Sequence, residues 1–235
     1  MRCGLFGKLA AKRDFIALFA PREFLDTWEP WMQSSISASR EKLARQWQQA
    51  FVTAPIWRFW LGSDLCGRTV LGAFMPSLDA LGRYYPLTIF GYADRGAAIS
   101  PPDLEPQDEW FAQAEEFLLR TLGKDVPFET VTGALDSLPA PRQQPTEQAP
   151  DKLTGLTPGA MAAVVEGGDF LDAFSSLRAA NHESVYAAAS SWWTIGGEGF
   201  PPLALTCRRM PDPFLFTNML TGLDREAGQQ GDAEL

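Results

Sequence analysis

The chain has 235 residues, a net charge of −9 and 46% hydrophobic residues. A domain of this length buries roughly 70–75% of its unfolded surface, so it needs neither a disulfide nor a metal to hold a core. An acidic chain without a Lys/Arg cluster binds phosphate backbones poorly, which argues against a nucleic-acid-binding protein.

The charge is unevenly divided along the chain. Residues 1–100 hold 12 Lys/Arg and 8 Asp/Glu, a net charge of +4, whereas residues 101–235 hold 8 and 21, a net charge of −13. The basic part could face an acidic or phosphorylated protein partner. Ordinary solvated charge explains the same pattern more simply, so both interpretations stay open.

Cysteine usage and hydropathy bear on the compartment. Cys3, Cys66 and Cys207 lie far apart and form no Cys-x-x-Cys pair, so we expect reduced thiols. No apolar run reaches the ~18–20 residues that span a bilayer, and residues 1–8 lack the apolar centre of a signal peptide. These features predict a soluble cytoplasmic protein.

The first elements are an opening strand or turn over residues 5–16 and a long helix after Pro21. The helix carries large apolar residues at helical spacing on one face: Phe24, Leu25, Trp28, Trp31, Met32 and Ile36. Pro30 lies inside this pattern, where it removes one backbone hydrogen bond and clashes with the preceding turn. We therefore expect the helix to kink or restart near Glu29.

A second helix and three strands follow. The helix is predicted over residues 40–50. The strands, over residues 54–61, 69–75 and 87–92, are rich in β-branched and aromatic residues and are joined by short links. Such strands are expected to be neighbours in one sheet, and their almost continuous apolar character indicates that both faces of the sheet are covered.

The connection between the second and third strands is densely set with residues that restrict a backbone. Pro76 and Pro86 fix their own φ angles, and Gly82 permits a positive φ. Asp79 and Arg83 are four residues apart, and we expect them to pair across the connection. A structural role for this pair is our first interpretation, with a partner-binding edge as the alternative.

The second half begins with a helix whose predicted N-cap is Asp108 and whose apolar stripe comprises Trp110, Phe111, Ala114, Phe117, Leu118 and Leu122. A weaker helix is predicted over residues 125–138. Residues 139–158 hold five prolines and predict an exposed, partly disordered loop. The helix predicted over residues 168–180 should face the core with Phe170, Leu171, Phe174 and Leu177.

The chain is then predicted to form an antiparallel hairpin from residues 192–195 and 203–207. Asp212, followed by proline, predicts the start of a last helix whose buried side carries Phe214, Leu215, Met219 and Leu220. Residues 223–235 predict a disordered tail. These elements indicate an α/β fold: a three-layer α/β/α sandwich around a mixed central sheet, in one domain over residues 1–222.

Catalytic chemistry has little support in the sequence. A hydrolase would need Ser77 and Asp79 to be joined by His182, the single histidine, and no Gly-x-Ser-x-Gly motif surrounds any serine. Ser77 and Asp79 are more simply explained by side-chain to backbone hydrogen bonds in a turn. Phosphate-loop and dinucleotide motifs are absent, and the carboxylate pairs are not at ligand spacing, so we expect no metal and no cofactor.

Short motifs in a fixed order resemble the TagF (ImpM) family of type VI secretion accessory proteins. They are Gly4-Leu5-Phe6-Gly7-Lys8-Leu9, Asp14-Phe15, the helix from Trp28 to Gln33, Ser39-Arg40, Trp47, Ala54-Pro55-Ile56-Trp57-Arg58-Phe59, Gly72 and Pro76-Ser77-x-Asp79-x-x-Gly82-Arg83-Tyr84-Tyr85-Pro86-Leu87-Thr88. The chain departs from the family pattern at Arg13, where the family has glycine, at Ala10, where it has proline, and at Pro30.

The resemblance implies a three-layer α/β/α fold without catalytic activity. It also implies a cytoplasmic regulator that restrains type VI secretion after translation by binding the system's forkhead-associated-domain scaffold protein. An assembly factor for the secretion baseplate or membrane complex is the alternative within binding functions, and a hydrolase is the alternative of another class. The candidate partner-binding or structural residues are Lys8, Asp14, Trp31, Arg40, Trp57, Arg58, Ser77, Asp79 and Arg83.

Overall fold

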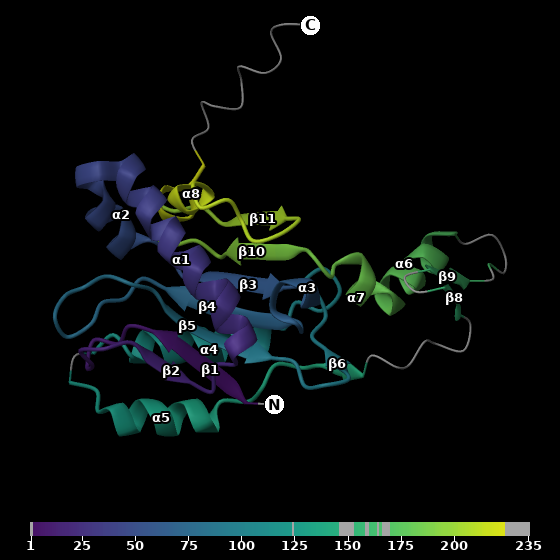
Figure 1. The fold of residues 1–235 in the computed structure, drawn as a ribbon, viewed down its shortest axis with the longest axis horizontal. Helices are drawn as coiled ribbons and strands as arrows, with labels where there is room; N and C mark the ends of the chain where they lie inside the picture. The colour runs from purple at the N-terminus through teal and green to yellow at the C-terminus, as the bar shows by residue number, and fades with distance from the viewer. Residues whose placement is uncertain are drawn as a thin grey trace, which may run out of the picture.

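A computed structural model describes residues 2–123, 125–145, 153–157, 160–163, 165 and 170–223. Its centre is a seven-stranded sheet in the order β11-β10-β3-β4-β5-β1-β2 (Figure 1). The strands are β1 (Cys3–Gly7), β2 (Ile16–Leu18), β3 (Trp57–Leu61), β4 (Val70–Met75), β5 (Leu87–Tyr92), β10 (Ser190–Thr194) and β11 (Leu203–Cys207). Neighbouring strands are antiparallel at every pairing, so the α/β class is confirmed but the expectation of a mixed sheet is wrong.

The three predicted central strands are neighbours, as expected. Every residue of β3, β4 and β5 is buried, because helices cover both faces of the sheet. At Gly72 in β4, a Cβ atom would lie 2.3 Å from the ring of Phe59 on β3. Glycine therefore allows the Phe59 ring to lie flat against the neighbouring backbone.

One helical layer consists of α1 (Arg22–Leu43), the 3-10 turn Ala44–Gln46, α2 (Trp47–Thr53) and α8 (Leu215–Thr221). The indole ring of Trp28 lies at its centre, with centroid distances of 5.3 Å to Phe24, 4.5 Å to Phe59 and 5.9 Å to Trp192. Rings from α1, β3 and β10 thus form one aromatic cluster, which joins strands far apart in the sequence to the same helix.

The helix α1 continues through Pro30 without a break in the described structure, so the predicted restart near Glu29 is wrong. Pro30 is exposed, whereas Trp28 and Trp31 on the opposite side are buried. The missing hydrogen bond therefore falls on the solvent side, where water can satisfy the free carbonyl, and packing of the buried face holds the helix together. The predicted second helix is divided between the end of α1, the 3-10 turn and α2.

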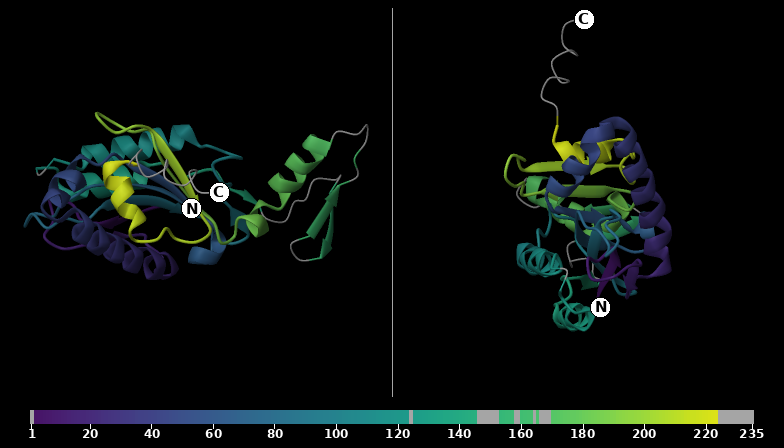
Figure 2. Two further views of the ribbon diagram at one scale, coloured as in Figure 1. Left: turned by 90° about the horizontal axis from the view of Figure 1, so that it is seen from above. Right: turned by 90° about the vertical axis from the view of Figure 1, so that its left-hand side faces the viewer.

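The other helical layer consists of α4 (Asp108–Arg120) and α5 (Phe128–Ser137), and Figure 2 shows the sheet between this layer and α1. The apolar stripe of α4 is buried as predicted, except for Leu122, which lies beyond the end of the helix and is 53% exposed. Gln107 occupies the N-cap position without a side-chain hydrogen bond, so the prediction of Asp108 as the cap is wrong. The short strands β6 (Ala97–Ala98) and β7 (Gln144–Pro145) pair with each other, and the short helix α3 (Ser63–Cys66) contacts α1 on the other side of the sheet.

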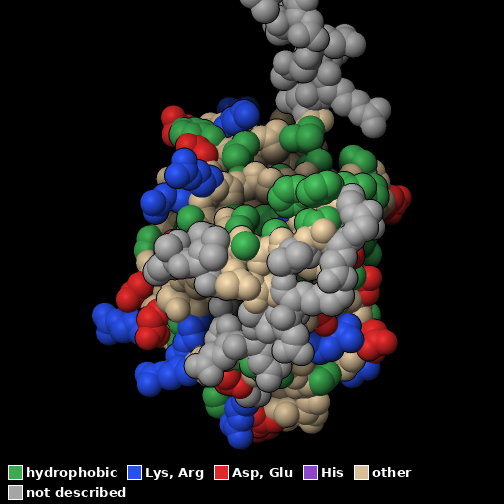
Figure 3. Space-filling view, turned by 90° about the vertical axis from the view of Figure 1, so that its right-hand side faces the viewer, with side chains coloured by type: hydrophobic (Ala, Val, Ile, Leu, Met, Phe, Trp, Pro, Cys, Tyr) green, Lys and Arg blue, Asp and Glu red, His purple; other side chains and the backbone are tan. Residues whose placement is uncertain are grey.

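A separate group of elements projects from one end of the sheet: β8 (Leu153–Thr157), β9 (Ala160–Ala163), α6 (Phe170–Ala180) and α7 (His182–Val185) (Figure 1). The expectation that α6 faces the core is wrong, because Phe170, Leu171 and Phe174 are 62%, 82% and 65% exposed. In Figure 3, which looks onto this end, hydrophobic side chains gather in the upper half of the face. The helical period was predicted correctly, but α6 contacts β9 rather than the central sheet.

The predicted proline-rich loop contains strand residues at both of its described parts, in β7 and β8, and residues 146–152 and 158 lie outside the described residues. The hairpin of β10 and β11 is confirmed. Near the C-terminus, Asp212 accepts a hydrogen bond from the Phe214 amide in a turn that precedes α8. The prediction that Phe214 and Leu215 are buried is wrong, because both side chains are exposed. Residues 224–235 of the predicted tail lie outside the described residues.

We predict that Trp28→Ala lowers the free energy of unfolding by about 3–5 kcal/mol, because it removes the ring at the centre of the aromatic cluster. Ile195→Ala, at a side chain that is 64% exposed, is the control and should change stability by less than about 0.5 kcal/mol. Urea unfolding followed by tryptophan fluorescence measures both. Equal effects would contradict the central position of Trp28.

Candidate functional site

Two connections meet at one end of the sheet. Gly7, the last residue of β1, pairs with Leu87 at the start of β5, and Met75 at the end of β4 pairs with the same Leu87. The β1–β2 connection, residues 8–15, and the β4–β5 connection, residues 76–86, are therefore brought side by side. The β4–β5 connection contains Asp79 and Arg83, which were predicted to pair.

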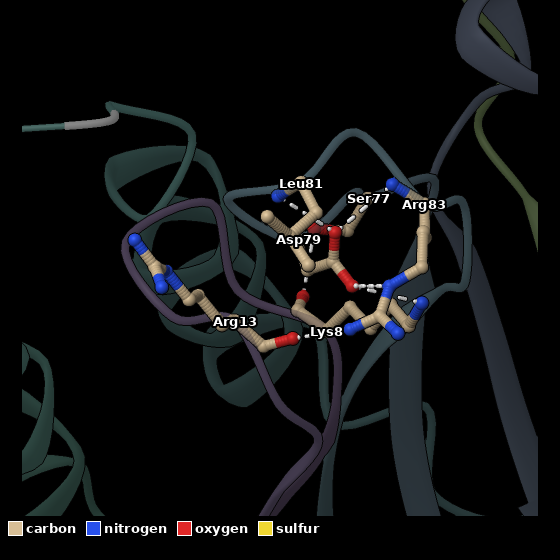
Figure 4. Close-up of polar contacts among 6 residues, drawn as sticks. All are labelled: Lys8, Arg13, Ser77, Asp79, Leu81 and Arg83. Atoms are coloured by element: carbon tan, nitrogen blue, oxygen red, sulfur yellow. Dashed lines mark hydrogen bonds and ion pairs between the residues drawn. The ribbon is translucent and has the colours of Figure 1, made fainter.

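The carboxylate of Asp79 lies between these connections and is fully buried. Its oxygens lie 3.0 Å from Lys8 Nζ and 2.7 Å from Arg83 Nε, and they accept hydrogen bonds from the backbone amides of Leu81 (3.0 Å) and Arg83 (2.9 Å) (Figure 4). The predicted pairing of Asp79 with Arg83 is confirmed. Lys8, Ser77, Asp79 and Arg83 are called the Asp79 cluster below.

Opposing effects determine the protonation of Asp79. Burial acts to raise the pKa of the carboxyl group, because it removes water from the charged form. The amide of Arg83, the Lys8 ammonium, the Arg83 guanidinium and the amide of Leu81 oppose this effect and together hold the pKa well below its usual range. Asp79 is thus a permanent anion that is satisfied from several sides, and it has no proton to give or take near neutral pH.

Further hydrogen bonds join the two connections. Ser77 Oγ donates to the Lys8 carbonyl at 2.8 Å, the Ala80 amide donates to the Lys12 carbonyl at 2.8 Å, and Arg83 Nη2 donates to the Arg13 carbonyl at 2.5 Å. The Arg13 contact uses the backbone, so the departure from the family pattern at this position leaves it intact. The side chains of the Asp79 cluster are engaged in holding two turns together.

The other predicted site residues lie elsewhere. Trp31 and Trp57 are core residues whose indole N–H groups donate to the carbonyls of Pro211 and Met219. The Arg40 guanidinium stacks over the Trp47 ring at 4.2 Å, at the end of α1. Asp14 is exposed in the turn before β2. None of these four joins the Asp79 cluster.

Arg58, a buried residue of β3, forms a second ionic group on the face of the sheet that α4 covers. Its Nε lies 2.5 Å from Glu115 Oε1, its Nη1 lies 3.5 Å from Asp108 Oδ1, and its guanidinium stacks over Phe111 at 4.8 Å. These partners all come from α4, so Arg58 fastens that helix to β3. Sequence reasoning selected Arg58 but missed Glu115, because nothing local signals a partner 57 residues away.

The arrangement needed for a hydrolase is not formed. His182 lies in the segment between α6 and Ala189. The Ala189 carbonyl accepts a hydrogen bond from the Gly62 amide, and the neighbouring Leu61 pairs with Val70, so this segment leads to the start of β4. Ser77 follows the end of β4, and a six-residue strand separates its two ends by about 17 Å. The proposed catalytic group of Ser77, Asp79 and His182 is therefore wrong.

Neither a reactive thiol nor a metal site is present in the described ranges. The three cysteines are free, as predicted, and burial raises the pKa of Cys3 to about 11 and of Cys66 to about 12, so neither is an activated thiolate. Within those ranges no three His, Cys, Asp or Glu side chains are grouped so as to hold a metal ion. The helices described include none that is long and apolar enough to cross a membrane.

Comparison with known proteins agrees with this geometry. The family model for the TagF N-terminal domain, described as type VI secretion system-associated, matches residues 4–138. This range includes both connections, strands β2–β5 and all of β1 except Cys3, and it defines a type VI secretion-associated α/β protein.

The match covers more than half of the sequence, and the chain belongs to the TagF family. The crystal structure of PA0076 from Pseudomonas aeruginosa PAO1 is similar over 94% of this chain and 95% of that one, with a TM-score of 0.78 and 29% identity. Comparison with curated proteins finds no match.

We predict that Asp79→Asn lowers the free energy of unfolding by about 3 kcal/mol at pH 7, because Lys8 then lies buried without its anion. The folded-state pKa of Asp79 is lowered, so its contribution is present above the unfolded pKa of about 4 and is lost as pH falls below it. The stability difference should therefore narrow in acid. Urea unfolding at pH 7 and pH 3.5 measures it, and a constant difference would contradict the ionised state.

We also predict strong coupling between Lys8 and Arg83. Lys8→Met or Arg83→Ala alone leaves one cation beside Asp79, whereas the double variant leaves a buried carboxylate with only backbone partners. The loss of stability in the double variant should exceed the sum of the single losses by at least ~1 kcal/mol. Arg13→Ala keeps the carbonyl that Arg83 contacts and is the matched control, with an expected change within about 0.5 kcal/mol. Additive losses would show that the cations act separately.

Proposed function

We propose that this type VI secretion-associated protein is a non-catalytic regulator that acts in the cytoplasm. In this proposal it restrains secretion after translation by binding the forkhead-associated-domain scaffold protein of the secretion system. The observation that carries the proposal is the TagF match over residues 4–138, a range that contains the whole Asp79 cluster. A binding protein needs a surface of fixed shape, and the cluster supplies that rigidity to two exposed connections.

The absence of catalysis in this proposal is supported by how the polar groups are used. Ser77 donates to a backbone carbonyl, Asp79 is held as an anion by two cations, and His182 Nδ1 lies 2.7 Å from the Ala179 carbonyl at the other end of the sheet. Ser77 Oγ, the Asp79 carboxylate and His182 Nδ1 thus each have a structural partner. A surface for protein binding is the simpler role for these connections.

The proposal predicts that the purified chain binds the scaffold protein from the same cell, and that deleting its gene raises secretion of type VI substrates. Binding is measured by co-purification and calorimetry, and secretion by substrate in culture supernatant. Unchanged secretion together with no scaffold binding would overturn the proposal. Reduced secretion after deletion would instead favour an assembly factor for the baseplate or membrane complex.

A further inference from the structure

A groove lies directly beside the Asp79 cluster. It has a volume of about 170 Å³, and its lining comes from the β1–β2 connection, α2, the β4–β5 connection and the segment after α4: Ala10, Phe51, Val52, Pro76, Ser77, Leu78, Tyr84 and Leu122. It is called the Leu122 groove below. Four segments far apart in the sequence converge on it, all within the range matched by the family model.

The groove has an apolar rim that is open to solvent. Val52 and Leu122 line it and are 48% and 53% exposed. These two apolar side chains line a concave surface and are half exposed, as is typical of a protein-binding site.

The floor of the groove is held in place before any partner arrives. Ser77 lines the groove and belongs to the Asp79 cluster, whose contacts fix residues 76–86. The Tyr84 ring lies 5.7 Å from both Trp47 and Phe51, and its hydroxyl accepts a hydrogen bond from Gln48. A partner side chain would therefore enter a preformed site, which lowers the entropy cost of binding.

Three stretches of sequence that include lining residues of the groove are basic, although the chain is acidic. Residues 8–14, 40–53 and 76–86 hold 7 Lys/Arg and 3 Asp/Glu, a net charge of 7 − 3 = +4, against −9 for the whole chain. Among the described residues, Arg13, Lys42 and Arg45 form no ion pair with a carboxylate. Their charge is thus available to a partner, and it favours an acidic one.

From these observations we infer that the Leu122 groove binds an acidic segment of the protein partner. A large apolar side chain of that segment fills the groove, and neighbouring carboxylates face Arg13, Lys42 and Arg45. The inference rests on the proposed function, since it assigns a surface and a chemistry to that binding. One buried anchor surrounded by charge explains how a small groove contributes both affinity and specificity.

Binding of the purified scaffold protein to the full-length chain tests the inference. Leu122→Asp and Val52→Asp place a charge in the groove and should weaken binding at least about tenfold, with unchanged melting temperatures because both side chains are exposed. Leu171→Asp is the matched control: it alters an 82% exposed leucine on α6 and should bind as the unaltered chain does. Arg13→Glu should weaken binding and reduce its dependence on salt.

The outcomes separate the two proposals. Binding that survives both groove substitutions, or that is lost in Leu171→Asp alone, overturns the groove assignment and leaves the proposed function standing. Absence of binding by the unaltered chain overturns the groove assignment, and together with unchanged secretion after gene deletion it overturns the proposed function as well. A dimer of the unaltered chain that dissociates in Leu122→Asp while scaffold binding persists would assign the groove to a second copy, and it also overturns the inference.

Discussion

The buried carboxylate of Asp79 is the constraint on which the candidate binding surface depends. A charge without water is stable only where cations and amides surround it closely. Lys8 and Arg83 come from different connections, so the same contacts that satisfy Asp79 also fix the two turns relative to each other. The floor of the Leu122 groove is part of one of these turns. The shape of the surface therefore follows from the need to satisfy one anion.

The rest of the sheet shows how the remaining elements are held. Aromatic rings around Trp28 join α1 to β3 and β10 on one face, and Arg58 joins β3 to α4 on the other. Both groups meet at β3, near the middle of the strand order. The end of the sheet that carries the Asp79 cluster is thus anchored to a core with packed layers on both sides, which gives the exposed connections a rigid base.

What could be predicted from the sequence depended on the range of the interaction. Neighbouring apolar runs predicted β3, β4 and β5 as adjacent covered strands, and the spacing of Asp79 and Arg83 predicted their pairing, because both signals are local. Lys8 is 71 residues from Asp79, and no pattern marks them as partners. The direction of the strand pairs was likewise beyond apolar patterning, which distinguishes covered from exposed faces but not parallel from antiparallel pairing. For α6, periodicity predicted the helix but not what it packs against.

The distribution of exposed apolar surface favours the Leu122 groove over α6 as the site of the proposed binding. Both carry exposed leucines, but α6 presents a convex helix face beyond the range of the family match, whereas the groove is concave and part of its lining belongs to the turns fixed by the Asp79 cluster. A concave apolar site bordered by charge can reject a partner of the wrong sign as well as accept the right one. The basic N-terminal part of the sequence was compatible with either solvated charge or an acidic partner, and the inference assigns some of this charge to contact with an acidic partner.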